Sequence, residues 1–476
     1  MRRQQLCARE AIQRRCYTRD RVHLLCTYSQ LRGRSISMSQ EVEDLSGRAV
    51  RKSSQSGPES WQMDPTLGAP MIPPDEWSFW PYSSWTFSHV SECTRTAGVW
   101  RGPGPVLPLA QRPRDIGDIE ITSRDGRRAT IHDYLDRDYT DGFLVLHRGE
   151  IVFEAYMNGM EPHFKHIARS GSKSITGTVF GILVHRGLIC PESLVTRYLP
   201  ELQATAYRGA TVQHLLDMTA GATMKGPWHE PHTDYYNFCV ASGYFGPAEA
   251  HPDAPADMWQ AILRITEQEA PHGARFAYFD PNIDVLGLIM QRVTGKFLPE
   301  LYSSELWGPM GAEEDACQIV DASRFAMSSG GFQATLRDFA RFALLHLRRG
   351  RLNGRQIVPS EWIEATRRPK PLLFKAFEND ASSYVDARSE LPNGAYHNTF
   401  WIEDQERGAY IAWGYGGQVI YIDPEADFAA VKLSHQPSQL PVKRARWPDQ
   451  VYQAAPKPLL FDSFAAIRAI RDELER

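Results

Sequence analysis

"HIARSGSKSITGTVFGILVHRG" (residues 166–187) is the stretch on which the prediction of the fold depends. It places Ser170 and Lys173 three residues apart at the start of an apolar helix, which the periodicity predicts over Ser174–His185. That spacing puts both side chains on one helical face, where the helix N-terminus adds partial positive charge. A serine becomes a nucleophile when a base takes its proton, and lysine is such a base only when neutral. The alternative interpretation is a capped surface helix.

Strand patterns lie on both sides of this helix in the sequence. Residues 141–159 predict a hairpin with strands at Phe143–Leu146 and Ile151–Tyr156. Three further strands with short connections are predicted near the C-terminus, at residues 409–414, 418–424 and 428–434. Short connections make strands antiparallel neighbours, and the hairpin most simply joins them in one sheet. The predicted fold class is α+β, an antiparallel sheet flanked by helices with a helical subdomain over roughly residues 190–345.

Helical periodicity fills the middle of the chain and returns at its end. The predicted helices are Val212–Met218, Met258–Thr266, Val285–Thr294 and Leu336–Leu347. The final stretch "DSFAAIRAIRDELER" places Phe464, Ile467, Ile470 and Leu474 on one face. We therefore expect a terminal helix that covers one face of the sheet.

The first 60 residues differ from the rest of the chain. Residues 1–37 are rich in arginine and lack the apolar core of a secretory signal. They read as a mitochondrial-type transit peptide, as a disordered tail, or as the result of a start codon placed too early, with Met38 the true beginning. The last two interpretations are favoured, and residues 53–58 then form a flexible linker.

Residues 61–130 are rich in proline and tryptophan, with "PPDEWSFWPYSSWTFSHV" as the densest part. Prolines forbid a long helix or a central strand, whereas aromatic side chains at this density usually pack on something. We predict an extended arm that packs on the main domain, residues 131–476.

Composition excludes several classes of function. The net charge of −4 argues against nucleic acid as a partner, and no apolar run is long enough for a membrane span. The seven cysteines are scattered without a CxxC pair, which favours a reducing compartment, the cytoplasm, over a disulfide framework. In "WHEPHTD" (228–234) Pro231 interrupts any helix, so we expect no zinc site there. No metal or other cofactor is expected, and the predicted assembly is a monomer or homodimer.

The start of the predicted helix and the motifs that follow it resemble those of a known family. "SGSKSITG", "VTRYLPEL" and "ATVQHLLDMTAG" are similar to the serine β-lactamase-like hydrolases, which include class C β-lactamases, DD-peptidases, esterases and amide hydrolases. The resemblance runs from about Gly142 to Leu433. The "SSGGFQATLRDFARF" segment (328–342) and the aromatic arm look most like 6-aminohexanoate-dimer (nylon-oligomer) hydrolases. The resemblance implies hydrolysis of an ester or amide through an acyl-enzyme on Ser170, with Lys173 as general base.

A second motif of the family, Tyr-x-Asn or a variant, matches Tyr278 in "RFAYFDPNIDVLG". Its third position holds Asp280 instead of asparagine, and Asn282 follows two residues later. A phenol near Lys173 can relay a proton to the leaving group, so Tyr278 is predicted to be catalytic and Asn282 to bind substrate. The alternative for Tyr278 is simple packing before an apolar helix.

The third motif is expected on an edge strand beside the serine, at Tyr415-Gly416-Gly417-Gln418. Here β-lactamases carry Lys-Thr-Gly, whose cation helps to hold a carboxylate, and its absence argues against β-lactamase activity. A strand without side chains at Gly416 and Gly417 lets a substrate lie close. The backbone N–H of Gln418 and that of Ser170 are the predicted oxyanion hole.

The substrate is predicted to be a small-molecule ester or amide. The stretch "WHEPHTD" together with Tyr235 and Tyr236, which follow it, either lines or borders the cleft or is a plain surface loop. Tyr415 is expected to contact substrate. The rival function is a catalytically weak penicillin-binding sensor or scaffold on the same fold, since a fold does not fix a function.

Overall fold

The computed structural model describes residues 72–248, 251–380, 387–437, 459 and 461–476, and the backbone of residues 42–43 and 49–50. Strands β1 (Val42–Glu43) and β2 (Ala49–Val50) pair antiparallel. The rest of the predicted N-terminal tail, and the predicted linker at 53–58, lie outside the described residues.

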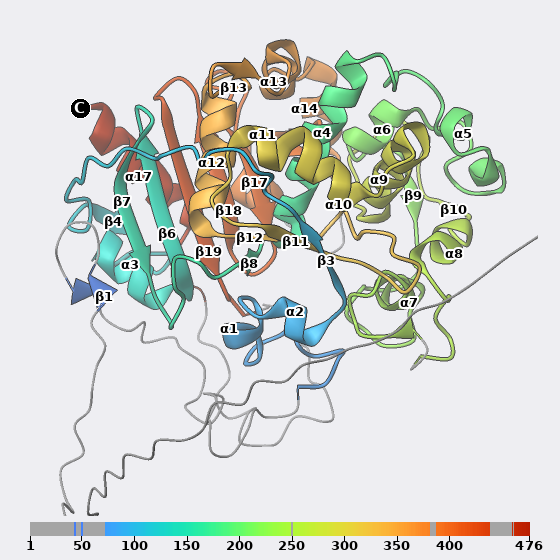
Figure 1. The fold of residues 1–476 in the computed structure, drawn as a ribbon, viewed down its shortest axis with the longest axis horizontal. Coiled ribbons are helices and arrows are strands. Elements are labelled where there is room, and N and C mark those ends of the chain that lie inside the picture. Colours follow the sequence, from blue (N-terminus) through green and yellow to red (C-terminus); the bar gives the residue numbers. More distant parts are fainter. Residues whose placement is uncertain are drawn as a thin grey trace, which may run out of the picture. The chain divides into compact units, whose positions relative to one another are not determined.

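A seven-stranded antiparallel sheet is the centre of the fold (Figure 1). Its strands, in spatial order, are β15 (Ala395–His397), β16 (Phe400–Ile402), β17 (Tyr410–Gly414), β18 (Gln418–Asp423), β19 (Phe428–Ser434), β6 (Thr140–His147) and β7 (Glu150–Tyr156). β19 pairs with β6 through opposed residues such as Ala430 and Val145. The predicted hairpin and the three predicted C-terminal strands therefore share one sheet, which confirms the α+β fold class.

Helices cover both faces of this sheet. Side chains alternate between faces along a strand, and Tyr410 of β17 faces α12 (Leu336–Leu347), where its hydroxyl lies 3.1 Å from His346 Nδ1. Trp413, on the opposite face of β17, packs edge-on against Phe464 of α17 (Ser463–Glu475). The prediction that the terminal helix covers the sheet is confirmed.

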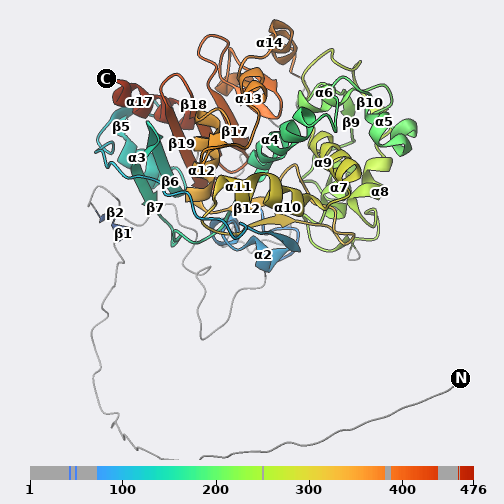
Figure 2. The same cartoon turned by 45° about the horizontal axis from the view of Figure 1, so that its top comes forward.

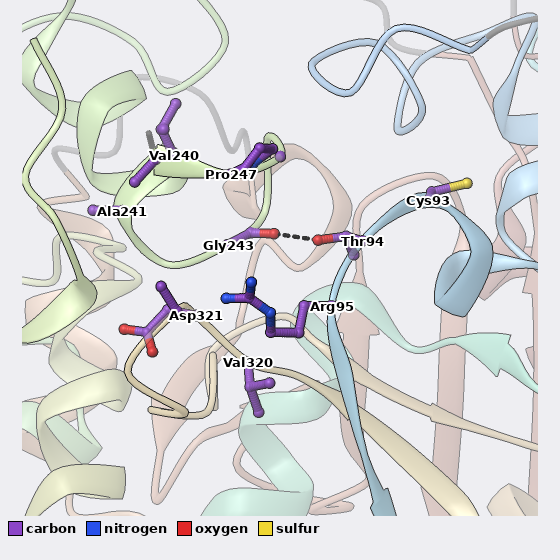
Figure 3. Close-up of a pocket in the computed structure, with 12 residues that line it drawn as sticks. Cys93, Thr94, Arg95, Val240, Ala241, Gly243, Pro247, Val320 and Asp321 are labelled. Atoms are coloured by element: carbon purple, nitrogen blue, oxygen red, sulfur yellow. Dashed lines mark hydrogen bonds between the residues drawn. The ribbon is translucent and has the colours of Figure 1, made fainter. Parts of the chain in front are cut away.

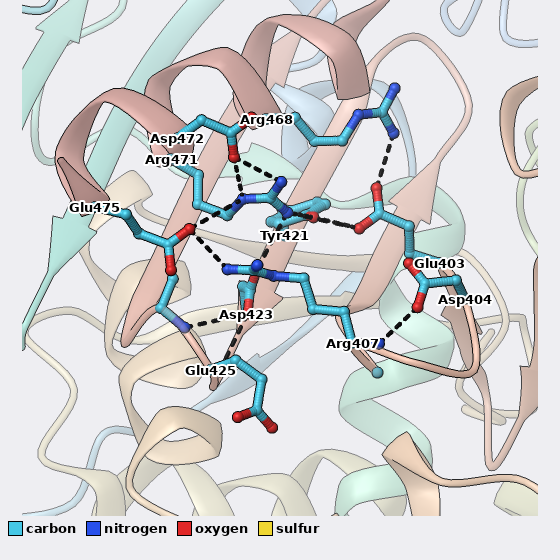
Figure 4. Close-up of polar contacts among 12 residues, drawn as sticks. Glu403, Asp404, Arg407, Tyr421, Asp423, Glu425, Arg468, Arg471, Asp472 and Glu475 are labelled. Carbon is cyan, nitrogen blue, oxygen red and sulfur yellow. Dashed lines mark hydrogen bonds and ion pairs between the residues drawn. The ribbon is translucent and has the colours of Figure 1, made fainter.

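Charged side chains also attach α17 to the sheet (Figure 4). Arg471 donates to the Tyr421 hydroxyl at 3.0 Å and to Asp423 Oδ2 at 3.2 Å, both on β18. Arg468, one turn earlier on α17, donates to Glu403 at 2.8 Å. The network fixes the orientation of the last helix over β18.

A second, four-stranded sheet leads into the predicted nucleophile. Its order is β3 (Thr96–Val99), β11 (Ala316–Ile319), β12 (Phe332–Ala334) and β8 (His166–Ile167). From β8 the chain turns into the short 3-10 helix η2 (Arg169–Gly171) and then α4 (Ser172–His185). The Ala168 N–H donates to the Phe332 carbonyl at 2.8 Å, so β12 holds the chain immediately before Ser170.

α4 lies between the large sheet and a group of helices (Figures 1 and 2), and it contacts both β17 and α9. The group comprises α5 (Val195–Tyr198), η3 (Pro200–Ala204), α6 (Val212–Leu216), α7 (Asp234–Ala241), α8 (Met258–Leu263), α9 (Pro281–Thr294), α10 (Leu298–Leu301), η5 (Tyr302–Trp307) and α11 (Gly308–Met310), with the hairpin of β9 (Ala222–Thr223) and β10 (Glu267–Gln268). α9 begins four residues before its predicted start because Pro281 suits the first helical position. Within the described residues, no helix is long and apolar enough to cross a membrane.

The remaining elements frame the two sheets. They are α1 (Ser83–Thr86), α2 (Val90–Cys93), β4 (Glu120–Thr122), β5 (Arg128–Thr130), α3 (Ile131–Arg137), β13 (Arg351–Leu352), β14 (Arg355–Gln356), α13 (Ser360–Arg367), α14 (Pro371–Glu378) and α15 (Ala387–Glu390). Aromatic side chains of the segment around α1 are buried: Trp77 donates to the Tyr244 carbonyl at 2.7 Å, and Phe79 stacks on Trp228 and Phe245.

Candidate active site

Ser170 and Lys173 meet as their spacing predicts. Lys173 Nζ lies 3.0 Å from Ser170 Oγ, and the lysine side chain is only 1% exposed. Nζ also donates to the Ser329 carbonyl at 2.6 Å. Ser172, the other serine of the turn, is engaged elsewhere, because its Oγ accepts the Phe332 N–H at 2.9 Å. Ser170 is therefore the serine that Lys173 contacts.

Asp280 forms an ion pair with Lys173, a contact that the sequence did not predict. Its Oδ1 lies 2.6 Å from Lys173 Nζ, and its side chain is 20% exposed. The Asp280 N–H donates to the Tyr235 hydroxyl at 3.2 Å, which fixes the backbone just before α9. The residue that stands where the family motif has asparagine thus contributes a carboxylate to the site.

Tyr278 lies against the same lysine. Lys173 Nζ is 4.9 Å from the centre of its ring, and its hydroxyl is hydrogen-bonded to the Ser170 side chain. The ring stacks on Trp401 at 5.2 Å, which holds it in place. Burial and the charge of Asp280 raise the pKa of Tyr278 well above its ordinary value, although the bond to Ser170 acts in the opposite direction. Tyr278 is therefore a neutral phenol that can donate a proton.

A second carboxyl, Asp284 of α9, acts on Lys173 indirectly through Ser329. Its Oδ1 accepts the Ser329 N–H at 3.0 Å and its Oδ2 the Ser329 hydroxyl at 2.8 Å. The same Ser329 offers its carbonyl to Lys173. Burial raises the pKa of Asp284 to about 7 and Asp280 adds to the rise, whereas the Ser329 hydrogen bonds and Lys173 lower it. Asp284 thus positions the acceptor that orients Lys173.

The third motif forms a turn and not the edge strand that the sequence predicted. Tyr415, Gly416 and Gly417 connect β17 to β18, and the two glycines have φ of 79° and 85°, a conformation that favours glycine. Gln418 begins β18 opposite Gly414, and its side chain donates to the Gly416 carbonyl at 3.0 Å. The glycine pair therefore satisfies the geometry of the turn.

Close approach of the strand to the nucleophile occurs at Gly414 instead. A Cβ at this position would lie 2.3 Å from the Ala168 carbonyl oxygen and 3.1 Å from Arg169 Cβ. β16 pairs with β17 only at Tyr410 and Ile411, so the other end of β17 is left beside the Ser170 turn. The sequence contained this glycine but gave no signal to separate it from the pair that follows.

Three predicted substrate-binding residues, Tyr235, Tyr236 and Asn282, have different surroundings. Tyr235 reaches Asp280 through its hydroxyl, whereas Tyr236 stacks on Phe245 and donates to Asp75 at 3.5 Å, on the side of the aromatic arm. Asn282 is buried in the first turn of α9, where its Nδ2 faces the Met218 sulfur at 3.6 Å. Tyr235 thus contacts Asp280, the carboxylate that pairs with Lys173.

The stretch "WHEPHTD" borders the third-motif turn. The sequence predicted either a wall of the cleft or a surface loop here. Trp228 packs edge-on against Tyr415 at 5.6 Å and stacks on Phe245. Across the described part of the chain, no group of three or more His, Cys, Asp or Glu residues is arranged to hold a metal ion.

A surface pocket lies apart from Ser170, with a volume of about 210 Å³. It is bounded by the segment between α2 and β3, the end of α7 and the chain after β11, and Figure 3 shows Arg95 extending into it near Asp321. The Asp321 carboxylate accepts the N–H groups of Met258 and Phe325, and burial raises its pKa to about 6. None of the predicted catalytic residues lines this pocket.

Comparison with known proteins identifies relatives that cover most of the chain. The family model "Beta-lactamase" matches residues 129–455. The chain is 30% identical over 363 residues to the 6-aminohexanoate-dimer hydrolase of Paenarthrobacter ureafaciens, covering 76% of this chain and 88% of that protein. A solved structure named "Putative 6-aminohexanoate-dimer hydrolase from Bacillus anthracis" has a TM-score of 0.69 at 29% identity, over 77% of this chain and 92% of the other.

A family VIII carboxylesterase shares the fold, with a TM-score of 0.50 and 17% identity over 70% of this chain and 91% of the other. The predicted resemblance to the serine β-lactamase-like hydrolases, and to the nylon-oligomer group among them, is confirmed by these matches. The family match contains Ser170, Lys173, Tyr278 and Gln418. The chain belongs to the beta-lactamase family of hydrolases.

Proposed function

We propose that the protein is a serine hydrolase that cleaves carboxylic ester or amide bonds through an acyl-enzyme on Ser170, with Lys173 as general base. The contact of 3.0 Å between Ser170 Oγ and a nearly fully buried Lys173 Nζ carries this proposal. It is within the reach that a base needs to take a proton from a nucleophile.

Asp280 accepts the proton that Lys173 has to give up before it can act as a base. An ammonium cannot accept a proton, and the Asp280 carboxylate lies 2.6 Å from Nζ. Transfer of one proton from Lys173 to Asp280 leaves a neutral amine beside Ser170. Lys173 then takes the Ser170 hydroxyl proton as Oγ forms its bond to the substrate carbonyl carbon.

The proposed oxyanion donors are the backbone N–H groups of Ser170 and Gln418. Support comes from the packing of η2 against β17 and the start of β18, with the Gln418 side chain tied to the turn between them. Donors that are already oriented stabilise the oxygen charge without reorganisation.

Tyr278 delivers the proton to the leaving group in this scheme. Its hydroxyl is bonded to Ser170 and its ring lies over Lys173, so the proton that Lys173 took can pass to the departing alcohol or amine as the C–O or C–N bond breaks. In deacylation Lys173 takes a proton from water, the hydroxide attacks the acyl carbon, and Ser170 regains its proton as the acid leaves.

One relative is named 6-aminohexanoate-dimer hydrolase and one solved structure a putative hydrolase of the same dimer. Two amino acids join through an amide, and on that ground we propose that short linear amides are substrates as well as esters. Amides make the greater demand, because an amine leaves only when protonated. A neutral Tyr278 meets that demand.

Hydrolysis of p-nitrophenyl butyrate by matched serine variants tests the proposal. Ser170→Ala should lose activity to the background level. Ser172→Ala should remain active, because Lys173 lies beside Ser170 Oγ, whereas the Ser172 hydroxyl accepts the Phe332 N–H. Full activity in Ser170→Ala would overturn the proposal. An acyl group that stays bound to the wild type without turnover would favour the penicillin-binding sensor.

A further inference from the structure

Arg169, the residue before the nucleophile, is a buried cation with no carboxylate bonded to it among the described residues. Its side chain is only 4% exposed, and Nη1 has no hydrogen-bond partner in that part of the chain. A buried charge is unfavourable for stability unless it is compensated. The fold therefore buries a positive charge, at a cost in stability, one residue before Ser170.

Four aromatic rings provide the compensation. The guanidinium carbon of Arg169 lies 5.0 Å from the ring centres of Tyr244 and Tyr415, 5.2 Å from Phe87 and 6.0 Å from Trp77. A desolvated cation is attracted to the negative face of each ring. We call Trp77, Phe87, Tyr244 and Tyr415 the aromatic cage; they come from the α1 region, the loop after α7 and the third-motif turn.

The conformation of Arg169 carries a second local cost. Its φ is 51°, in the left-handed region that is unfavourable for a residue with a Cβ. Burial lowers the pKa of Arg169 to about 10, so its charge persists at neutral pH. Unfavourable local features of this kind are found most often at functional sites.

One partly buried carboxylate, Asp280, interacts with both cations of the site. It pairs with Lys173 at 2.6 Å and attracts Arg169 at longer range. The other groups that face Lys173 are the hydroxyls of Ser170 and Tyr278 and the Ser329 carbonyl, with Asp284 behind Ser329.

The titratable groups that face Arg169, besides Asp280, are two phenols and one thiol. They are the phenols of Tyr244 and Tyr415 and the thiol of Cys239, whose pKa burial raises well above its ordinary value. The two cations therefore compete for Asp280.

We propose that Arg169 is a positioning residue that acts through Lys173: its charge, fixed in the aromatic cage, favours the neutral amine of Lys173 and the alkoxide of Ser170. The inference rests on the proposed function of those two residues. A like charge disfavours a second ammonium nearby, and it also stabilises the negative charge that develops on Oγ. The aromatic faces stabilise the charge of Arg169 without a second carboxylate. A second carboxylate would favour the ammonium form of Lys173.

The pH dependence of kcat/KM for p-nitrophenyl butyrate separates this role from a merely structural one. In R169M the acidic limb of the profile should move to higher pH by about one unit, because Lys173 then keeps its proton longer. R169K keeps a cation in the cage at pH values below the pKa of the new lysine, and over that range the limb should stay at its wild-type position. Folding of each variant is verified by its melting temperature, and R169Q replaces R169M where the latter does not fold.

A rate that falls by the same factor at every pH in R169M or R169Q, with the limb unmoved, would overturn the inference and make Arg169 a packing residue. A shifted limb in R169K as large as that in R169M would also contradict it. These outcomes are distinct from failure of the proposed function, which appears as hydrolysis that survives Ser170→Ala.

Discussion

Replacement of Asp284 by asparagine should change the stability of the protein in a pH-dependent way. Asp284 is fully buried and accepts the N–H and the hydroxyl of Ser329 on its two oxygens. Asparagine keeps the shape, but its NH₂ group carries one hydrogen more than the protonated carboxyl that it replaces, which adds a buried donor. At pH 4 we expect Asp284→Asn to be less stable than the wild type by about 1–3 kcal/mol, the cost of a buried donor left without an acceptor.

The advantage of the wild type should disappear as the pH rises. Burial raises the pKa of Asp284 from 3.8 to about 7. The folded protein therefore holds this proton more tightly than the unfolded chain, and the stabilisation is complete below pH 3.8 and lost as the pH rises through 7. A difference of about 3 pKa units corresponds to about 4 kcal/mol. Asparagine does not titrate, so the variant should become the more stable protein near pH 7.5.

Urea unfolding of both proteins, followed by circular dichroism at several pH values between 4 and 7.5, measures this difference. The free energy of unfolding of Asp284→Asn minus that of the wild type should rise by about 4 kcal/mol over the range. Titrating groups that do not interact with Asp284 are common to both proteins and cancel in the subtraction. A difference that stays constant with pH would refute the buried, protonated state of Asp284 and the network built on it.

Lys173→Arg should lose at least about 100-fold in esterase activity, nearly as much as Lys173→Ala, because arginine keeps the charge but cannot accept the proton; retention of a tenth of wild-type activity would contradict this. Gly414→Ala should abolish activity and cost roughly 1–3 kcal/mol in denaturant unfolding, because its Cβ meets the Ala168 carbonyl at 2.3 Å, whereas Gly98→Ala, with open space at its Cβ, is the control and should behave like the wild type. Nitrocefin should be hydrolysed far more slowly than p-nitrophenyl butyrate, because Tyr415 offers no charge to a β-lactam carboxylate; an equal or higher kcat/KM for nitrocefin would contradict this.

Elements with a strong local pattern were predictable from the sequence. β6, β7 and the three strands from β17 to β19 have apolar runs bounded by turn residues, and their short connections determined the pairing. The second sheet was not predictable, because its β8 and β12 have two and three residues, and β3 pairs with β11 across more than 200 residues of chain. Local periodicity contains no information about such a pairing.

At the site, the sequence located Ser170 and Lys173 because a fixed spacing on one helix determines their contact. Asp284 had an available signal: it follows Asp280 by four residues at the start of a helix, so both carboxyls project to one side. Arg169 had none, because its aromatic cage gathers rings from segments far apart in sequence. Gly416 and Gly417 were placed on a strand because a glycine pair serves a strand and a turn equally well.

Intact-mass and peptide mass spectrometry after brief mixing with a p-nitrophenyl ester or a fluorophosphonate probe tests the central claim most directly. One acyl or phosphonyl group per chain should be found on Ser170, in the peptide that also contains Ser172, with fragmentation to separate the two serines. The wild-type acyl adduct should disappear as substrate is exhausted, and Ser170→Ala should show no adduct at all. A label on Ser172, or continued hydrolysis without any adduct on Ser170, would contradict the account.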